Sequence, residues 1–547
     1  MWLETYRRRI LCVCVALLAA SVGNAAEWGQ LNTRPGTFPG AATAAAAAAA
    51  PAGEHSCALV CSCLQRHYLR HIAADAFLTA ALSALHATEP RADLIPVQDG
   101  WRLRWDGQAL ADLRSSDRGS DAQSLCAVGH TLDLLLHDLG QNVTAERREF
   151  LAVAMVNAGC GRLDAYTRWL PPMRARNLDD DLAGCFAGIG AELTRRDDGF
   201  IFASVPTGLP ADRAGIHCGD RLVAVAGVPV AGWDEDAVVA RIHGPAGSRI
   251  ALTVTRIGIA TPVTCDVVRA VIRPANLRAC RLDNVAYIRL DSMTADAAQD
   301  LRAAIAALQA AGPGPLAGLV LDLRGNRGGL VHQATEIAGC FLPRGAAIVR
   351  LVPAAGPPTT TVNHDAPVLT VPLAVLVSPA TASAAELLAG TLQSHDRAAV
   401  IGTVTFGKGL VQALCDLPDG GICKCSVAEY RLPGNERVQD LGVMPDVALA
   451  PPGVPLGAGA APALLDLTGS RYLAAPAITE SLASLITANP EPGEDAHGNI
   501  IPDALARRTM AVLARTRGMD RSAVISQWRS TDGGAEPLIS RENPPVP

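Results

Sequence analysis

Residues 375–390 read Val-Leu-Val-Ser-Pro-Ala-Thr-Ala-Ser-Ala-Ala-Glu-Leu-Leu-Ala-Gly. This stretch predicts an apolar strand that passes through small residues into a helix, and Ser383 lies where the helix would begin. A serine at such an elbow points its hydroxyl outwards, beside the free amides of the first helical turn, which can stabilise an oxyanion. The alternative interpretation is that Ser383 only caps the helix.

The surrounding chain repeats the strand–turn–helix pattern. Residues 319–323 and 373–377 form short apolar runs, interrupted only by Asp322, and each is followed by a Gly- or Ser-rich turn and a helical run. Short apolar strands that alternate with helices are typical of an α/β core in which helices cover the strands.

The turn at 322–329 reads Asp-Leu-Arg-Gly-Asn-Arg-Gly-Gly. Glycines let backbone approach a ligand closely, so the amide of Gly328 or Gly329 is a candidate oxyanion donor. A purely structural interpretation, in which Asp322 pairs with Arg324, is compatible with this role.

Residues 402–412 read Gly-Thr-Val-Thr-Phe-Gly-Lys-Gly-Leu-Val-Gln. Lys408 stands out because most basic residues of this chain are arginine. Desolvation among apolar residues would lower its pKa, so that the neutral amine accepts a proton from a serine. The alternative is a solvated loop lysine. We discount a phosphate-binding loop, because the Walker spacing and a following Ser or Thr are missing.

Taken together, these stretches resemble the carboxyl-terminal processing proteases, also called tail-specific proteases. Residues 381–387 are similar to the family's Ser-Ala-Ser-Ala-Ser-Glu-Ile elbow, and residues 405–409 to its Thr-Phe/Tyr-Gly-Lys-Gly motif. The 25-residue separation of Ser383 and Lys408 is the family's usual one. The resemblance implies that Ser383 is the nucleophile and Lys408 its general base.

Three further motifs carry the resemblance. Residues 322–329 resemble Asp-Leu-Arg-x-Asn-x-Gly-Gly, and residues 442–447 resemble Gly-Ile-x-Pro-Asp-Val. Residues 163–172 resemble Leu-Asp-Pro-His/Tyr-Ser-x-Tyr-Leu, with Ala165 in place of the family's proline. The resemblance extends over about residues 120–450, and the ordered occurrence of five motifs makes it specific.

The resemblance also implies roles for neighbouring residues. Gln412 and Glu386 would orient or tune the lysine, although a carboxylate near a lysine raises the lysine pKa and opposes activation unless burial outweighs it. The amide of Ala384 would join those of the Gly-Gly turn in holding the oxyanion.

Residues 187–257 resemble a PDZ domain. Gly188, Ile189 and Gly190 are similar to the carboxylate-binding loop, whose amides hold a peptide terminus while the peptide adds as a strand. The alternative is a small β-domain without a peptide function.

Together, the two resemblances imply a mixed α/β (α+β) fold for the chain. The expected architecture is a ββα-type, ClpP/crotonase-like protease core with an inserted PDZ domain and flanking helical regions.

The expected organisation follows from composition along the chain. Arginines at 7–9, an apolar run at 10–22 and small residues before position 26 predict an export signal. The predicted parts are a signal peptide (1–25), an Ala/Pro-rich linker (26–54), an N-terminal helical region (55–180), the PDZ domain (187–257), the protease core (265–450) and a C-terminal helical extension with a disordered tail (451–547).

The export signal predicts a periplasmic or otherwise extracytoplasmic protein, or a membrane-associated one if the signal stays uncleaved. The net charge is −6, with 18% charged residues and no basic stripe, so we expect no nucleic-acid partner. The expected partners are proteins or peptides with free C-termini.

Fifteen cysteines are compatible with export. Cys415 and Cys423 flank a turn and are candidates for a disulfide across a hairpin. An alternative for Cys57, Cys61 and Cys63, with His55, His67 and His71, is a metal site, but their spacing fits no standard zinc pattern. We expect neither a cofactor nor a metal.

Two functions from other classes remain open at this level. The chain can be a catalytically silent scaffold that recruits partners through its PDZ-like module, or a Ser–Lys hydrolase of small amides and esters. The Ser383, Lys408 and Gln412 set argues against the scaffold, and the PDZ-like module argues against the small-molecule hydrolase.

Overall fold

The computed structural model describes residues 56–98, 100–114, 124–140, 142–196, 199–233, 235–449, 493–494, 500–515 and 520–530. The predicted signal peptide at 1–25 and the linker at 26–54 lie outside the described residues. So does most of the predicted extension at 451–547, including its tail.

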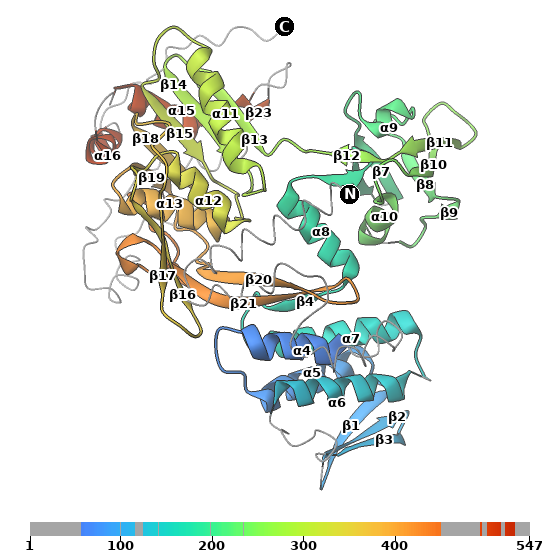
Figure 1. The fold of residues 1–547 in the computed structure, drawn as a ribbon. Helices are drawn as coiled ribbons and strands as arrows, with labels where there is room; N and C mark the ends of the chain where they lie inside the picture. Colours follow the sequence, from blue (N-terminus) through green and yellow to red (C-terminus); the bar gives the residue numbers. More distant parts are fainter. Residues whose placement is uncertain are drawn as a thin grey trace, which may run out of the picture. The chain divides into compact units, whose positions relative to one another are not determined.

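The described residues form two compact units (Figure 1). One is built from residues before 173 together with residues after 275, and the other is Met173–Ala275. The second unit is thus inserted into the first along the chain, in agreement with the predicted fold class. Within the described ranges, no helix combines the length and the apolar character that crossing a bilayer requires.

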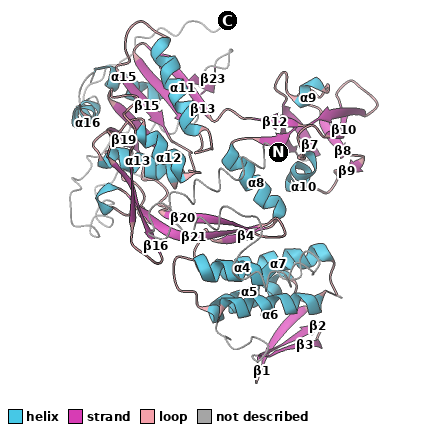
Figure 2. Ribbon diagram, viewed as in Figure 1, coloured by secondary structure: helices cyan, strands magenta, loops and turns pink. Residues whose placement is uncertain are grey.

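A six-stranded sheet forms the centre of the first unit (Figure 2). Its order is β13 (Leu277–Leu282), β14 (Val285–Leu290), β15 (Gly318–Asp322), β18 (Leu373–Val377), β19 (Ala398–Gly402) and β22 (Val447–Ala448). All neighbours are parallel except the antiparallel pair β13 and β14. Every residue of β15, β18 and β19 is buried. Parallel strands covered on both faces show no polar alternation, which explains the continuous apolar runs.

Helices cover both faces of this sheet. They are α11 (Ala297–Ala310), α12 (Val331–Gly339), α13 (Ala384–Ser394), α15 (Ala504–Arg515) and α16 (Arg521–Ser530). Leu321 lies in the apolar cluster with α11, α12 and α13, whereas its neighbour Val320 lies in the cluster with α15 and α16. The C-terminal helices therefore complete an α/β/α sandwich, and the predicted mixed α/β fold class is confirmed.

A second sheet lies beside this core and carries part of the candidate site. Its strands are β17 (Thr359–Val362), β16 (Ala347–Pro353), β21 (Ile422–Arg431) and β20 (Leu410–Asp416), in that order, and β4 (Arg168–Leu170) also pairs with β21. Because β4 belongs to the 163–172 segment, the pairing attaches the N-terminal region to the strand next to β20.

The N-terminal region is a helical bundle with a small sheet. The helices are α4 (Ser56–His67), α5 (Ala74–Thr88), α6 (Leu125–Leu139) and α7 (Ala145–Cys160), and they share one apolar cluster with Trp169 and Cys423. The bundle therefore packs against the hairpin of β20 and β21 through a continuous apolar core.

The N-terminal region predicted as helical, residues 55–180, also contains strands besides β4. Three antiparallel strands, β1 (Ala92–Val97), β2 (Gly100–Trp105) and β3 (Gln108–Arg114), form a sheet there. Apolar and basic residues alternate along β2, and Asp106 and Gly107 have φ of 48° and 82°. An Asp-Gly turn with positive φ at both positions joins the strands of a hairpin with the correct twist.

The second unit is built on an antiparallel sheet. Its elements are α8 (Pro172–Ala183), β5 (Phe186–Gly188), β6 (Glu192–Arg196), β7 (Gly199–Ser204), α9 (Pro210–Arg213), β8 (Arg221–Val225), β9 (Val228–Pro229), α10 (Glu235–Ile242), β10 (Arg249–Thr255), β11 (Val263–Val268) and β12 (Ala270–Ile272). The strand order is β11-β10-β8-β7-β6, with β9 on β8, so β6 is an edge strand. Strands β5 and β12 form a separate antiparallel pair.

The borders of this unit differ from the predicted ones. Residues 173–180, predicted as part of the N-terminal region, and residues 265–275, predicted as the start of the protease core, both belong to the second unit. For residues 265–275 the reason is strand pairing, because β11 pairs with β10 and β12 returns to pair with β5. Residues 173–180 belong to helix α8, which leads into β5.

Asp503 links the C-terminal helix α15 to Arg324 of the core. Replacing it tests how much this link contributes to the stability of the protein. Its carboxylate accepts from Arg324 Nη1 at 2.7 Å and from the Ala506 amide at 2.9 Å, and its side chain is 1% exposed. We expect Asp503→Ala to lower the free energy of unfolding by about 2–4 kcal/mol, as the loss of a helix cap and of a buried charged hydrogen bond.

Urea denaturation measures this loss. Asp520→Ala is the matched control, because Asp520 also caps a helix, through the Ala523 amide, but is exposed. Equal losses in the two variants would contradict a special contribution of the Arg324 contact.

Candidate active site

Ser383 occupies the predicted elbow between β18 and α13. Its φ is 57° and its ψ is −120°, and its side chain is buried. A positive φ is uncommon outside glycine, carries strain and is found at functional sites. Helix-capping residues usually have an extended backbone, so capping alone does not account for this conformation.

The Gly328–Gly329 turn packs directly against this elbow. A Cβ atom on Gly328 would lie 2.7 Å from the Ala382 oxygen and 2.9 Å from both the Ala384 nitrogen and Ser383 Cβ. The φ of Gly328 is +94° and that of Gly329 is +135°. Only glycine satisfies both requirements, so the turn can pack this closely against the elbow. The sequence-based prediction concerned a different contact, the close approach of this backbone to a ligand.

The three predicted oxyanion donors differ in availability. The Gly328 amide donates to Asn326 Oδ1 at 2.9 Å and is therefore already occupied. The amides of Gly329 and Ala384 have no bonded acceptor among the described residues. This geometry favours Gly329 and Ala384 as donors and gives Gly328 a packing role instead.

Glu386 connects the elbow to the lysine loop. Its buried carboxylate accepts from the Ser383 amide at 2.8 Å, the Gly407 amide at 2.7 Å, the Lys408 amide at 2.8 Å and the Thr405 hydroxyl. It bonds the backbone of Lys408, whereas the sequence-based expectation concerned the ammonium group. The carboxylate therefore sets the position of two loops that are distant in sequence.

Lys408 is largely removed from water. Burial is the main cause that lowers the pKa of its ammonium group from the ordinary 10.5 to about 8, and the positive charges of Lys424 and Arg168 contribute to the same shift. Asp164 and Glu386 act in the opposite direction but more weakly. The predicted desolvation is therefore present, and burial outweighs the nearby carboxylates.

Gln412 holds the side chain of Lys408. The Lys408 Nζ donates to Gln412 Oε1 at 2.9 Å and lies 4.8 Å from the centroid of the Tyr166 ring. In the part of the chain that the structure describes, no hydrogen bond joins Nζ to the Ser383 hydroxyl. The lysine is thus oriented from the side of β20, by a residue predicted from sequence and by an aromatic residue that was not.

Tyr430 is a residue of this site that sequence reasoning missed. Its buried hydroxyl lies 2.9 Å from the backbone oxygens of both Ser383 and Lys408. It reaches them from β21, which follows Lys408 in sequence and carries no motif around Tyr430. The sequence contains no signal for this role, because the Tyr430 hydroxyl reaches Ser383 and Lys408 only when β21 folds beside the elbow.

Asp322 and Arg324 form an ion pair, as the structural interpretation of the turn at 322–329 predicted. The Arg324 guanidinium bonds both Asp322 and Asp503, and Tyr287 donates to Asp322 at 2.7 Å. The positive charge of Arg324 holds the pKa of the fully buried Asp322 carboxyl below its usual value despite desolvation. This network braces the start of the turn that leads to Gly328.

The predicted carboxylate loop lies in the second unit, at the end of β5. Gly190 has φ of +69° and Ile189 is buried, and the Ile189 oxygen accepts from the Ala211 amide of α9. The amides of Ile189 and Gly190 donate to no acceptor within the described ranges. The loop precedes the edge strand β6, which is the arrangement that strand addition of a peptide requires.

Comparison with known proteins identifies the family of the chain. Residues 284–449 match peptidase family S41, and residues 201–256 match the PDZ domain. A carboxy-terminal-processing protease of Bartonella bacilliformis is 32% identical over 318 residues, which is 57% of this chain and 72% of that protein. A carboxyl-terminal-processing protease of a Picosynechococcus species is 36% identical over 301 residues, 54% of this chain and 71% of that protein.

A solved structure, the photosystem II D1 C-terminal processing protease, is similar at 25% identity and a TM-score of 0.35, covering 68% of this chain and 93% of that chain. The family predicted from the ordered motifs is confirmed by the sequence relatives. The chain belongs to the carboxyl-terminal processing proteases of peptidase family S41 and is a serine-type peptidase with a PDZ domain.

Proposed function

We propose that this protease is an exported endopeptidase that cleaves proteins near their C-termini, with Ser383 as nucleophile and Lys408 as general base. The observation that carries the proposal is the Glu386 carboxylate, which bonds the backbone amides of both residues. The Glu386 carboxylate thus holds a serine with a strained backbone and a desolvated lysine in fixed positions, and this arrangement is suited to acyl transfer.

The first step requires the neutral amine of Lys408. With its pKa at about 8, about one-tenth of this lysine is neutral at pH 7, which is about 300-fold more than for an ordinary lysine. Gln412 Oε1 accepts one N–H of the amine and so directs its lone pair elsewhere. The Ser383 hydroxyl then attacks the scissile carbonyl carbon as its proton passes to Nζ.

The attack converts the carbonyl oxygen into an oxyanion. The amide of Ala384, at the N-terminus of α13, and that of Gly329 are its proposed donors, because both are without a bonded acceptor among the described residues. Such preorganised amides stabilise the negative charge that develops in the transition state and is carried by the tetrahedral intermediate.

Collapse of the tetrahedral intermediate breaks the C–N bond. The ammonium of Lys408 returns its proton to the leaving amine, and an ester to Ser383 Oγ remains. A water molecule, deprotonated by the same amine, then attacks this ester. The C–Oγ bond breaks, the Lys408 ammonium gives its proton to Oγ, and the new C-terminal carboxylate leaves.

The PDZ domain is the proposed site of tail capture. The amides of residues 188–190 would bind a terminal carboxylate, and the tail would add as a strand along the edge of β6. Export rests on the N-terminal pattern at residues 7–25, and we propose an extracytoplasmic location, with membrane association if that segment is retained.

Removal of the nucleophile or the base tests the assignment. We expect Ser383→Ala and Lys408→Ala each to reduce kcat for an unfolded protein substrate with an apolar tail by about a thousandfold or more, because the dyad acts as a unit. Ser394→Ala, on the same helix, is the control and should retain activity. Unchanged cleavage in either dyad variant would sink the assignment. A wild-type chain that neither cleaves nor reacts with a serine-directed probe would instead indicate a silent scaffold.

The pH dependence follows from the lowered pKa of Lys408. Because the base is active when deprotonated, kcat/KM should rise about tenfold per pH unit below pH 8 and level off above it. Arg168→Gln removes one of the positive charges that lower this pKa, so the midpoint should move to higher pH. A pH–rate profile of both proteins measures the shift, and a profile that falls with rising pH would exclude Lys408 as the base.

Tail capture is tested with one substrate in two forms, a free C-terminal carboxylate and a C-terminal amide. We expect the amide to lower kcat/KM by about 10- to 100-fold, the equivalent of losing hydrogen bonds to a charged group. Labelling of Ser383 by the serine-directed probe is the control and should not depend on the substrate form. Equal cleavage of both forms would refute carboxylate recognition while leaving the catalytic assignment intact.

A further inference from the structure

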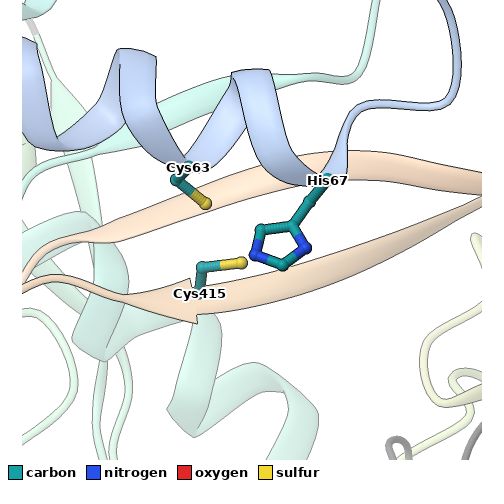
Figure 3. Close-up of side chains that lie close together, drawn as sticks. All are labelled: Cys63, His67 and Cys415. Carbon is teal, nitrogen blue, oxygen red and sulfur yellow. The ribbon is translucent and has the colours of Figure 1, made fainter. Parts of the chain in front are cut away.

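A cluster of thiol and imidazole groups lies between α4 and the hairpin of β20 and β21 (Figure 3). Cys63 and His67 project from α4, and Cys415 projects from β20 towards them. The two sulfur atoms and a ring nitrogen of the histidine all lie within 4.8 Å of one another. Neither the proposed catalysis nor the family motifs use these residues.

The fold itself brings these groups together. Cys63 and His67 are four residues apart on a helix, so their side chains share one face. That face is held against the second sheet, where the Leu69 amide donates to the Ser426 oxygen at 2.8 Å. On the sheet side, Cys415 is in register with Cys423 across the hairpin of β20 and β21.

Cys423 supplies a fourth candidate ligand. It is fully buried, and the Cys63 thiol interacts with the thiols of both Cys415 and Cys423. Three thiols and an imidazole, two from a helix and two from a hairpin, match the composition of four-coordinate structural zinc sites.

The geometry requires only a small adjustment. With Zn–S of about 2.3 Å and Zn–N of about 2.0–2.1 Å, tetrahedral ligand atoms lie about 3.6–3.8 Å apart. The separations of up to 4.8 Å among the ligand atoms of Cys63, His67 and Cys415 would shrink by about 1 Å, which side-chain rotation accommodates. Cys423 lies outside this group of three, and its thiol would turn towards them from the position opposite Cys415. His67 is exposed at the helix end, so it has room to turn, and the thiol protons would leave to solvent on metal binding.

We propose that Cys63, His67, Cys415 and Cys423 form a binding site for a thiophilic divalent cation, and that zinc is its preferred occupant. Soft thiolates with an imidazole select zinc over calcium or magnesium, which take oxygen ligands. The site would clamp α4 to the hairpin three residues from Gln412, and so would stabilise the strand that orients Lys408.

This site differs from both expectations drawn from the sequence. No metal was expected, and the alternative grouped Cys63 with Cys57 and Cys61. Those two cysteines face α6 instead: the Cys57 thiol interacts with Asp133 of α6, and a Cβ atom on Gly129 of α6 would lie 2.9 Å from Cys61 Cβ. The expected facing of Cys415 and Cys423 is present, but all cysteines within the described ranges are free thiols.

The experiment is zinc binding by the full chain, purified under reducing conditions and freed of metal with a chelator. After zinc chloride addition and gel filtration, we expect about one equivalent of zinc per chain, and cobalt in its place should give intense thiolate-to-metal charge-transfer absorption. Cys63→Ser and Cys415→Ser should lose both signals. Cys126→Ser, a half-buried cysteine on α6, is the matched control and should keep them.

His67→Gln guards against misfolding of the buried cysteine variants, because His67 is exposed. We expect it to weaken zinc binding at least about tenfold, since changes that only reorient a ligand already cost 10- to 100-fold. The proposal is overturned if reduced wild type binds no zinc, or if these variants bind it like wild type. It is also overturned if peptide mapping of the untreated protein finds a disulfide between Cys63 and Cys415 and no metal.

Discussion

The hydrogen bonding of one buried carboxylate underlies the geometry of the candidate active site. Glu386 is fully buried and receives three backbone amides and a hydroxyl, which replace the water that a carboxylate otherwise needs. Because two of those amides belong to Ser383 and Lys408, satisfying the carboxylate fixes both loops at once. Tyr430 adds a second tie through the oxygens of the same two residues.

The electrostatics of the site depend on the balance between burial and charge. Lys408 is one of only two lysines in the chain, and the other, Lys424, lies close enough to lower its pKa. A carboxylate bonded to the ammonium would have stabilised the protonated form. Glu386 instead bonds backbone amides, so it organises the lysine loop with only a weak effect on the proton affinity of the amine.

The regions before and after the protease core contact the loops of the candidate site. The Thr167 hydroxyl, beside β4, donates to Asp164 and accepts from the Ser426 amide. The Ser426 hydroxyl in turn accepts from Gln412, the residue that holds Lys408. The N-terminal segment is therefore connected to the lysine through a series of hydrogen bonds. At the opposite end, Arg324 joins the C-terminal helices to the turn that leads to Gly328. Both flanks therefore buttress loops of the site.

The sequence by itself determined the family and the α/β class, and it proposed Ser383, Lys408 and Gln412 as candidate site residues, because these depend on local patterns: apolar runs, glycine turns and a fixed spacing. The sequence also contains an alternation of apolar and basic residues from Trp101 to Trp105, which is typical of a strand. The prediction of a helical region at 55–180 did not use this alternation. Tertiary structure alone decided the rest. The engaged Gly328 amide, the Tyr430 bridge and the meeting of Cys63 with Cys415 arise from contacts between residues far apart in sequence, whose partners no local pattern specifies.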